Sequence, residues 1–542
     1  MKKINYLFIL GALLNIISVN AQDTTSIPSE SVQVIKNYEA IISQAKKKEV
    51  PIKREEQTFS NIKYSYKLDN ITSVDFERPE PKINVLGYQD KIKRKEDIKD
   101  GTVYGAYGNF STIKAGGAYH YYIEDWIDLG FKIDHYSAKN KDLAYNKSSQ
   151  TNANVYVSYF LSEKNKIGLD FYGSRQRHYT DRSFLTETPT TDSTLYVHPA
   201  DMIGAKLNYA HTSFEKTGLA FRFRLSYDRL KDNNGDYNEN LLSSEVNIIK
   251  KINDDTNFEM PLVYNNYKPS IDFQDNLNDY SIRPTLNYKG LNFKLKAGLE
   301  YTKADTSSFI FPIIDATYPA AFAGIDLRFF TSSSFNRNSF HYVSEYFPYF
   351  ISGQFNFTPN YLRSYNLNLI KPINNLAFGF NIALNSYTNE LLVSTLGQDD
   401  AAYLTRNIDR KEIRITPSVQ FKTETVNAEL NFNYNVFLNE DSLNILTYRP
   451  RFFVDLSASQ NLFDNKLRLR QKLRYNSARK VLAETELSLD AFVDIALGID
   501  YRINKSFSAF VDVTNLLGSE YTYWYNNPVY QQQVWVGIKL RI

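Results

Sequence analysis

Apolar and polar residues alternate along most of the chain, from Val103 to the C-terminus. A period of two puts successive side chains on opposite faces of an extended strand, so the pattern predicts β-strands with one apolar and one polar face. In the clearest run, the even positions are apolar and the odd positions polar: Val426, Ala428, Leu430, Phe432, Tyr434 and Val436 alternate with Asn427, Glu429, Asn431, Asn433 and Asn435. We therefore expect an all-β protein.

The lengths of these runs and of their connections favour a membrane barrel over a soluble β-sandwich. Runs of about 10–14 residues match the roughly 9–11 residues that a tilted strand needs to cross a bilayer. Short connections at 463–465 and 504–506 contrast with long polar ones at 181–201 and 397–410, which is typical of periplasmic turns and extracellular loops. We expect residues 102–542 to form a transmembrane antiparallel β-barrel of about 20–22 strands.

Prolines interrupt the alternation most between residues 320 and 355. Pro312, Pro319 and Pro348 lie in or beside this region. Proline supplies no N–H to a β-ladder, so we expect short or bulged strands here.

The first 21 residues are typical of a secretory signal peptide. Lys2 and Lys3 precede an apolar run of about 14 residues, and a small-residue cleavage site ends at Ala21. The alternative, a membrane-spanning helix, needs about 20 apolar residues. Residues 22–101 are predicted to form an N-terminal periplasmic extension, with a short helix at 29–50 and then an irregular or β segment. A partly ordered tail is the alternative for its charged end.

Composition agrees with a barrel in the outer membrane of a Gram-negative bacterium. The chain has 41 tyrosines and 36 phenylalanines, which suit aromatic belts at the membrane interfaces. Charged residues make up 23% and the mean hydropathy is −0.42, values that argue against a helical membrane protein. Removing Lys2 and Lys3 with the leader leaves 61 basic and 60 acidic residues, so no general attraction for nucleic acid is expected. Outer-membrane lipid is the expected partner.

The last alternating run ends on an apolar residue, Ile542. A final strand of this kind closes a barrel when it pairs with the first strand, because closure removes both sheet edges. Many barrels end in phenylalanine or tryptophan, so Ile542 departs from the usual terminal residue.

Three segments resemble TonB-dependent receptors, a family of outer-membrane barrels. Residues 510–521 read FVDVTNLLGSEY and resemble the family's penultimate strand, and residues 534–540 read VWVGIKL and resemble its closing strand. Residues 357–367 read FTPNYLRSYNL and resemble the entry to its middle strands. The resemblance covers roughly the C-terminal half of the chain and implies the family's large barrel, without specifying a cargo.

The resemblance does not extend to a plug domain. Members of the family carry an N-terminal plug that fills the lumen, preceded by a segment that engages TonB. Residues 22–101 are too few for such a plug and lack its glycine-rich runs. We therefore interpret the chain as a plugless relative, and energised transport and a TonB partner are not carried over.

A row of cations occupies alternate positions of one predicted strand. It consists of Lys466, Arg468, Arg470, Lys472 and Arg474. On a luminal face these side chains would attract anions, because a low-dielectric wall focuses their field. The further pore-lining candidates are Lys294, Lys296, Arg222 and Arg224. The alternative is that each cation pairs with an inner-wall carboxylate such as Asp455, Glu429 or Asp494.

Four aromatic residues precede the last strand, namely Tyr521, Tyr523, Trp524 and Tyr525. Every membrane barrel has aromatic girdles, so we expect these side chains at the outer membrane interface. A platform for stacking sugars on an extracellular loop is the alternative.

No motif predicts catalysis. The six histidines show no metal-ligand spacing, and the chain has no Gly-x-Ser-x-Gly, His-Glu-x-x-His or phosphate-binding glycine loop. Distant residues can still converge, as in His178 with Asp181 or His198 with Asp201. We expect no enzymatic activity, no cofactor and no metal.

Two functions fit these features. The first is a passive channel or receptor for solutes, with the basic row in the lumen. The second is a structural or accessory barrel subunit of an outer-membrane secretion, assembly or surface-lipoprotein complex, with other envelope proteins as partners.

Overall fold

The computed structural model describes residues 101–542 except for 124–125, 140–146, 163, 182–194, 212–217, 233–236, 271–275, 291, 341, 344–356, 396–402, 439–447, 482–486 and 525–526. The predicted signal peptide at 1–21 and periplasmic extension at 22–101 lie outside the described residues, apart from Gly101, and stay predictions. No helix within the described ranges is long and apolar enough to cross a membrane.

The described chain is a succession of β-strands. In the first half they are β1 (Gly101–Gly108), β2 (Ile113–Ile123), β3 (Ile127–Lys139), β4 (Lys147–Ser162), β5 (Asn165–Asp181), β6 (Leu195–His211), β7 (Leu219–Asp232), β8 (Tyr237–Lys251), β9 (Thr256–Pro269), β10 (Leu277–Ile282), β11 (Thr285–Lys289), β12 (Lys294–Ala304), β13 (Ser307–Phe322) and β14 (Ile325–Arg337). In the second half they are β15 (Pro359–Ile373), β16 (Leu376–Thr395), β17 (Tyr403–Lys422), β18 (Val426–Phe437), β19 (Phe452–Leu462), β20 (Leu467–Asn476), β21 (Arg479–Lys480), β22 (Ser488–Leu489), β23 (Phe492–Arg502), β24 (Phe507–Thr514), β25 (Thr522–Trp524), β26 (Asn527–Pro528) and β27 (Gln533–Arg541).

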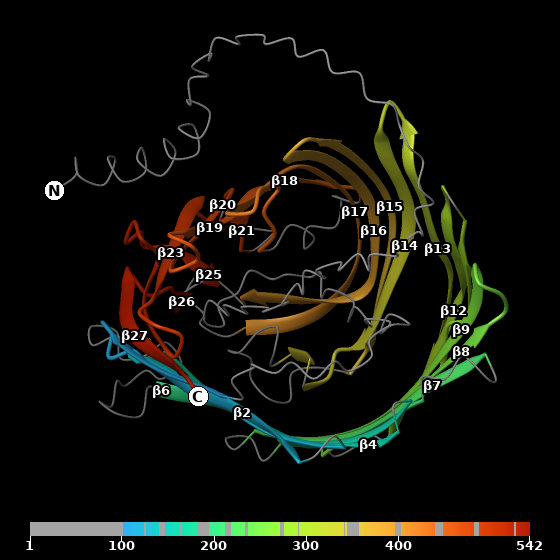
Figure 1. Ribbon diagram of the computed structural model, residues 1–542, viewed down its shortest axis with the longest axis horizontal. Coiled ribbons are helices and arrows are strands. Elements are labelled where there is room, and N and C mark those ends of the chain that lie inside the picture. Colours follow the sequence, from blue (N-terminus) through green and yellow to red (C-terminus); the bar gives the residue numbers. More distant parts are fainter. Residues whose placement is uncertain are drawn as a thin grey trace, which may run out of the picture. The chain divides into compact units, whose positions relative to one another are not determined.

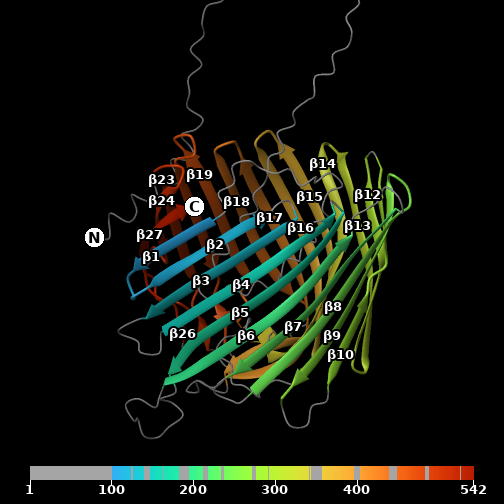
Figure 2. The same ribbon diagram turned by 60° about the horizontal axis from the view of Figure 1, so that its bottom comes forward.

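One antiparallel sheet contains all these strands except two small hairpins, β21–β22 and β25–β26. β10 and β11 pair with the same two neighbours and act as one interrupted strand, so the sheet has 22 strands. β27 pairs with β1, and the backbones of Gly101 and Ile542 exchange hydrogen bonds of 3.2 and 3.0 Å. The sheet is therefore a closed barrel with inclined strands, as predicted (Figures 1 and 2).

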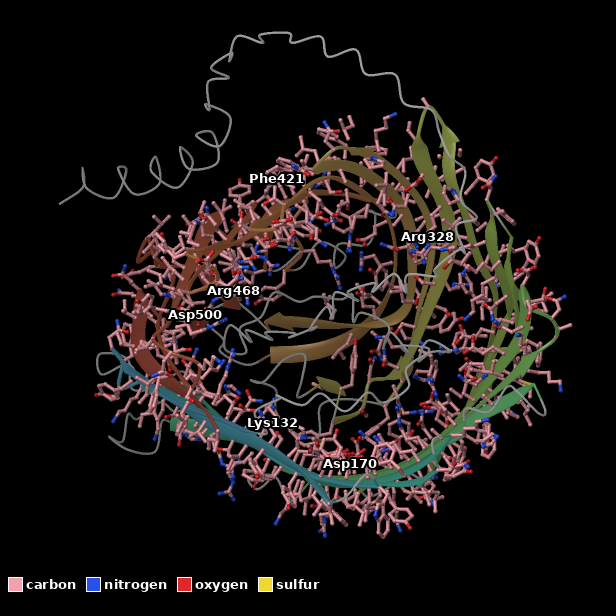
Figure 3. All side chains as sticks on the ribbon, in the orientation of Figure 1. Lys132, Asp170, Arg328, Phe421, Arg468 and Asp500 are labelled. Atoms are coloured by element: carbon pink, nitrogen blue, oxygen red, sulfur yellow. The ribbon has the colours of Figure 1, made fainter. Side chains whose placement is uncertain are left out.

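The two faces of the wall follow the sequence alternation. On β18, Phe432 and Tyr434 are exposed on the outer face, whereas Asn433 and Asn435 are buried on the inner face. On β3, Leu129, Phe131 and Ile133 are likewise exposed. Side chains project from both faces of the wall (Figure 3). Exposed apolar side chains on one face and buried polar ones on the other match a wall with lipid outside.

The connections differ in length at the two ends of the barrel. Turns such as 323–324 and 374–375 are short, and several connections at the opposite end are longer, up to residues 338–358. Short turns are periplasmic in bacterial barrels, so the long connections mark the extracellular end, which we call the outer mouth.

Two predicted loops were too long. Within the range 181–201, β5 extends to Asp181 and β6 begins at Leu195, and 397–410 includes the start of β17 at Tyr403. At the start of β17, Thr405, Arg406 and Asn407 follow one another, so the apolar and polar alternation fades there. The predicted irregularity near residue 320 is present as a register shift between Tyr318 and Phe322.

A lysine on the lipid face tests the assignment of the two faces. Phe131 is 47% exposed on the outer face of β3. We expect Phe131→Lys to lower the free energy of unfolding in lipid vesicles by about 2–4 kcal/mol, because the ammonium group would enter hydrocarbon. The adjacent Lys132, which pairs with Asp134, provides the control: Lys132→Gln should cost less than about 1 kcal/mol. Equal losses of unfolding free energy in urea titrations of the two variants would contradict the assignment of the two faces.

Candidate functional site

The extracellular halves of β16 and β17 bend away from the wall. Their register shifts between Tyr387 and Glu390, and Asn389 has a left-handed backbone (φ 54°), a conformation that asparagine tolerates better than most residues. The Asn389 side chain donates to the carbonyl of Pro359 (3.0 Å), and its backbone N–H donates to Asp409 (2.9 Å). Beyond this bulge the hairpin extends across the barrel interior (Figure 1).

The segment that follows β14 also folds inward. Asn338 is fully buried and donates to the carbonyl of Asn389 (3.1 Å) and to Oδ1 of Asn407 (2.8 Å). Two residues on, the backbone N–H of Phe340 donates to the Glu239 carboxylate of β8 at 2.7 Å. These bonds tie the segment to the hairpin on one side and to the barrel wall on the other.

Buried apolar side chains from these elements form one cluster at the outer mouth, which we call the mouth cluster. It consists of Leu230, Tyr237, Phe340, Val343, Phe357, Leu391, Phe492 and Tyr523. β7 and β8 supply the first two residues, and β16 and β23 supply Leu391 and Phe492. β8 and β23 are separated by nearly half of the barrel circumference and lie on opposite sides of the barrel (Figure 1). Because Tyr237 of β8 and Phe492 of β23 belong to the same cluster, it connects opposite walls across the lumen.

A buried network of charges supports the bend in the hairpin. Arg410, only 1% exposed, forms a fork with both oxygens of Glu390 (2.8 and 3.0 Å), also pairs with Glu412, and lies 3.7 Å from the ring centre of Tyr387. Arg449, which lies in the loop before β19, pairs with Glu390 at 2.9 Å. We call these residues, with Arg414, which pairs with Glu412 at 3.1 Å, the Arg410 network.

A second buried arginine fixes the start of the 338–358 connection. Arg337, 1% exposed, pairs with Asp279 of β10 and with Asp305 (2.7 Å). It also donates to the carbonyl of Phe357 at 2.8 Å. The guanidinium therefore joins β10 and the β12–β13 turn to residues at both ends of the inward segment.

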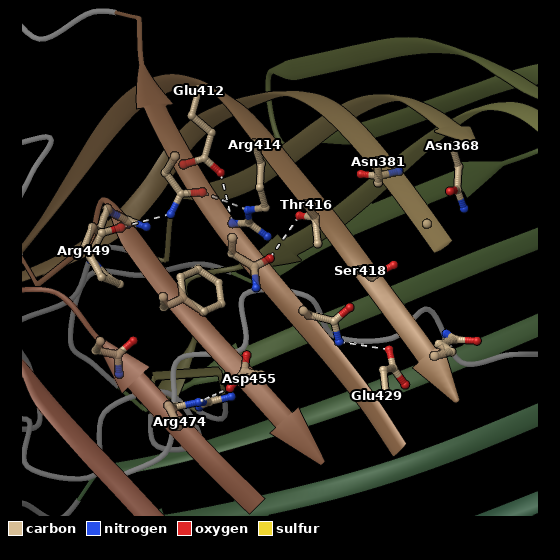
Figure 4. A pocket seen from close by; sticks show the side chains of 18 of the residues that line it. Asn368, Asn381, Glu412, Arg414, Thr416, Ser418, Glu429, Arg449, Asp455 and Arg474 are labelled. Carbon is tan, nitrogen blue, oxygen red and sulfur yellow. Dashed lines mark hydrogen bonds and ion pairs between the residues drawn. The ribbon is translucent and has the colours of Figure 1, made fainter. Parts of the chain in front are cut away.

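Below the Arg410 network lies a polar cavity of about 530 Å³ on the inner face of β14 to β20 (Figure 4). Seven of its lining side chains are amides, from Asn368, Asn381, Gln420, Asn431, Asn433, Asn435 and Asn476. Arg479 and Tyr523 line it from the extracellular connections. A volume of this size accommodates a small organic molecule.

Part of the cavity wall has unused hydrogen-bonding groups. The side chains of Asn368, Asn381, Ser418 and Gln420 have no hydrogen-bond partner among the described residues. Gly379 keeps this surface open, because a Cβ there would stand 2.2 Å from the Ser418 hydroxyl. These groups are available to a polar solute.

The predicted basic row lies on β20 and the turn before it. Lys466 is exposed in the turn, and Lys472 is exposed on the strand. Arg470 pairs with Asp500 (2.7 Å) and Asp512 (2.9 Å). Arg474 pairs with Asp455 at 2.6 Å, and Arg468 is half-buried. Arg470 and Arg474 therefore match the alternative in which luminal cations are neutralised by carboxylates.

The four further pore-lining candidates lie on β7 and β12, away from the cavity. Arg224 pairs with Glu245 at 3.0 Å, and Lys296 pairs with Glu259 at 3.4 Å. Arg222 is half-buried, whereas Lys294 is exposed at the end of its strand. The cations of β7 and β12 therefore form no continuous row with those of β20.

The placement of Tyr521 and Tyr523 differs from the predicted membrane-interface girdle. Tyr523 belongs to the mouth cluster, and Tyr521 stacks on Phe492 with ring centres 4.2 Å apart. Burial raises the pKa of the Tyr523 hydroxyl to about 12. The connection between β24 and β27 turns these rings inward, which composition alone does not reveal. The side chain of Trp524 and all of Tyr525 lie outside the described residues.

The histidine and aspartate pairs considered for catalysis are described in part, because the side chains of Asp181 and His198 lie outside the described residues. His178 and His198 are cross-strand partners on β5 and β6. Asp201 instead accepts hydrogen bonds from Arg177 at 2.7 and 2.9 Å. No group of three potential metal ligands gathers among the described residues.

Comparison with known proteins gives likenesses at the level of structure. No protein-family model matches the chain, and no curated protein matches it either. The fold is similar to the FrpB iron transporter of Neisseria meningitidis (TM-score 0.63, 11% identity, 84% of this chain and 83% of that one). It is also similar to the siderophore receptor PirA of Acinetobacter baumannii (TM-score 0.63, 11% identity, 82% and 81%) and to the ferric enterobactin receptor PfeA of Pseudomonas aeruginosa (TM-score 0.62, 10% identity, 81% and 80%).

At these identities the likeness concerns the fold. The chain is an outer-membrane β-barrel of a Gram-negative bacterium, with the 22-stranded barrel fold of TonB-dependent receptors. The resemblance seen in the sequence is thereby confirmed for the barrel. The absence of a plug concerns residues outside the described ranges and stays a prediction.

Proposed function

We propose that this protein is a receptor-type transporter whose solute occupies the luminal cavity and whose outer mouth is closed by its own loops. The observation that carries the proposal is the mouth cluster, which joins opposite walls above a cavity with unused hydrogen-bonding groups. The similar folds include proteins described as transporters and receptors, and we assign no catalytic role to this chain.

The sequence predicted either a passive channel or a receptor for solutes, and of these two functions we propose the receptor. A passive channel needs a continuous water-filled path, and the mouth cluster lies across the lumen. The basic row gives little net field where Arg470 and Arg474 pair with carboxylates. Anion selection by that row is therefore not part of the proposal.

Single-channel recording in planar bilayers tests the closed mouth. We expect the purified protein to show no steady conductance, whereas a variant with residues 391–407 replaced by a short glycine and serine turn should open to ions, because the hairpin end and Leu391 would be removed. A shortened periplasmic turn at 423–425 serves as the control and should stay closed. Steady wild-type openings that lose anion preference in a Lys466→Ser, Arg468→Ser and Arg470→Ser variant would support the passive channel instead.

A second candidate is a structural barrel subunit of an envelope complex. The buried, mutually paired charges of the Arg410 network favour it, since a rigid filled mouth needs no solute. Stoichiometric co-purification with other envelope proteins, together with a closed mouth in the shortened variant, would support this candidate. TonB engagement is not proposed, because it depends on residues before the barrel.

A further inference from the structure

Arg479 differs from the other cations that line the cavity. Arg414, Arg449 and Arg474 each pair with a carboxylate at 3.1, 2.9 and 2.6 Å. Among the described residues, the hydrogen-bond acceptors of Arg479, on β21, are the neutral carbonyls of Thr522 (2.7 Å) and Tyr523 (3.4 Å). A buried cation without an anion is costly, and within the part of the chain that the structure describes Arg479 lacks the carboxylate that the other three arginines have.

The surroundings of Arg479 are built to hold the guanidinium in place. The residue is 5% exposed, and its charged carbon lies 5.2 and 5.7 Å from the ring centres of Phe492 and Tyr523. No carboxylate pairs with it among the described residues, and its Nε has no hydrogen-bond partner there. Burial lowers the pKa of Arg479 to about 10, so the side chain stays charged at neutral pH. A fixed, charged and incompletely bonded guanidinium is suited to bind a carboxylate, sulfate or phosphate group.

Besides Arg479, the paired charges and Glu429, which accepts a hydrogen bond from Asn431 (2.9 Å), the lining has uncharged polar side chains that suit a hydroxyl-rich body. Donors and acceptors with no partner among the described residues come from Asn368, Asn381, Ser418 and Gln420. These residues line the same cavity as Arg479. Amides both donate and accept hydrogen bonds, which matches hydroxyl groups. The aromatic side chains of Tyr448 and Phe453 add apolar surface to the lining.

We propose that the cavity binds a small acidic saccharide or a similar polyhydroxylated anion, with its anionic group at Arg479 and its hydroxyls on the amide wall. This inference rests on the proposed function, because it names the class of solute that the receptor takes. It predicts that charge and hydroxyl content are both required for binding.

Lactobionate and lactose provide a matched pair of probes, because both carry a galactosyl unit but only lactobionate carries a carboxylate. By isothermal titration calorimetry on the purified full chain, we expect lactobionate to bind at least about tenfold more tightly than lactose. Arg479→Gln should remove this preference. Asn381→Leu should weaken the binding of lactobionate and should not strengthen the binding of lactose. Arg224→Gln, an inner-wall arginine outside the cavity, is the control and should bind like the wild type.

Two results would overturn the inference. One is equal affinity of the wild-type protein for lactobionate and lactose, or no binding of either. The other is binding of inorganic sulfate as tight as that of lactobionate, which would make Arg479 a simple anion site without a saccharide wall. Arg479→Lys separates binding from folding, because it keeps the charge and should retain part of the preference. Failure here with a closed wild-type mouth and an open shortened variant would reject the solute class and leave the receptor proposal intact.

Discussion

Replacement of Arg337 by methionine is expected to lower the free energy of unfolding by about 3–5 kcal/mol. Methionine preserves most of the side-chain volume but removes the charge that pairs with Asp279 and Asp305. Asp279 is almost completely buried and has no other cation within ion-pair distance among the described residues, so its carboxylate would be left without compensation. Urea unfolding of the protein in lipid vesicles, followed by tryptophan fluorescence, measures the loss.

A double variant shows whether the lost charge pair causes this effect. In Arg337→Met with Asp279→Leu, both charges are absent, and we expect more than half of the lost stability to return. Arg328→Met, which breaks an exposed pair with Asp315, is the matched control and should cost less than about 1 kcal/mol. A double variant no more stable than Arg337→Met alone would place the cause in packing rather than charge.

Replacement of Arg410 by methionine is expected to release the β16–β17 hairpin from the lumen, again at a cost of about 3–5 kcal/mol. The fork to Glu390, the pair with Glu412 and the contact with the Tyr387 ring would all be lost at the bulge. Among the described residues, Glu390 would keep one cationic partner, Arg449, and Glu412 would keep one, Arg414. Trypsin added to intact cells should then cleave at Arg406, whose backbone pairs with Leu392 in the β16–β17 ladder of the wild type.

Arg410→Lys provides the control for charge without geometry. Lysine keeps the positive charge but cannot form the two parallel bonds to Glu390, so we expect an intermediate loss of about 1–2 kcal/mol and partial cleavage. Full protection of Arg406 in Arg410→Met would show that the hairpin is held by the mouth cluster alone.

The sequence predicts the barrel wall well because lipid imposes a strict period of two. β18 alternates on both faces as the pattern indicates, and β27 pairs with β1 as expected of a closing strand. Where strands pass the lipid belt this constraint ends. Residues 403–410 therefore look like a loop in the sequence, although they form the start of β17.

The candidate site depends on pairings that no local pattern contains. Arg337 meets Asp279 across 58 positions, and Arg470 meets Asp512 across 42. The sequence identified Arg470 as luminal but did not identify the two carboxylates that neutralise it. Tyr521 and Tyr523 have the composition of a girdle, and only the course of the connection before β27 directs them inward.

The mouth cluster links opposite walls of the barrel and so restricts changes in its cross-section. Side chains from β7 and β8 are packed against those from β16 and β23, so the wall cannot become more oval without separating them. Opening of the mouth and a change in the barrel cross-section are thus one mechanical event. Lateral pressure in the surrounding membrane would then act directly on the equilibrium between the closed and open mouth.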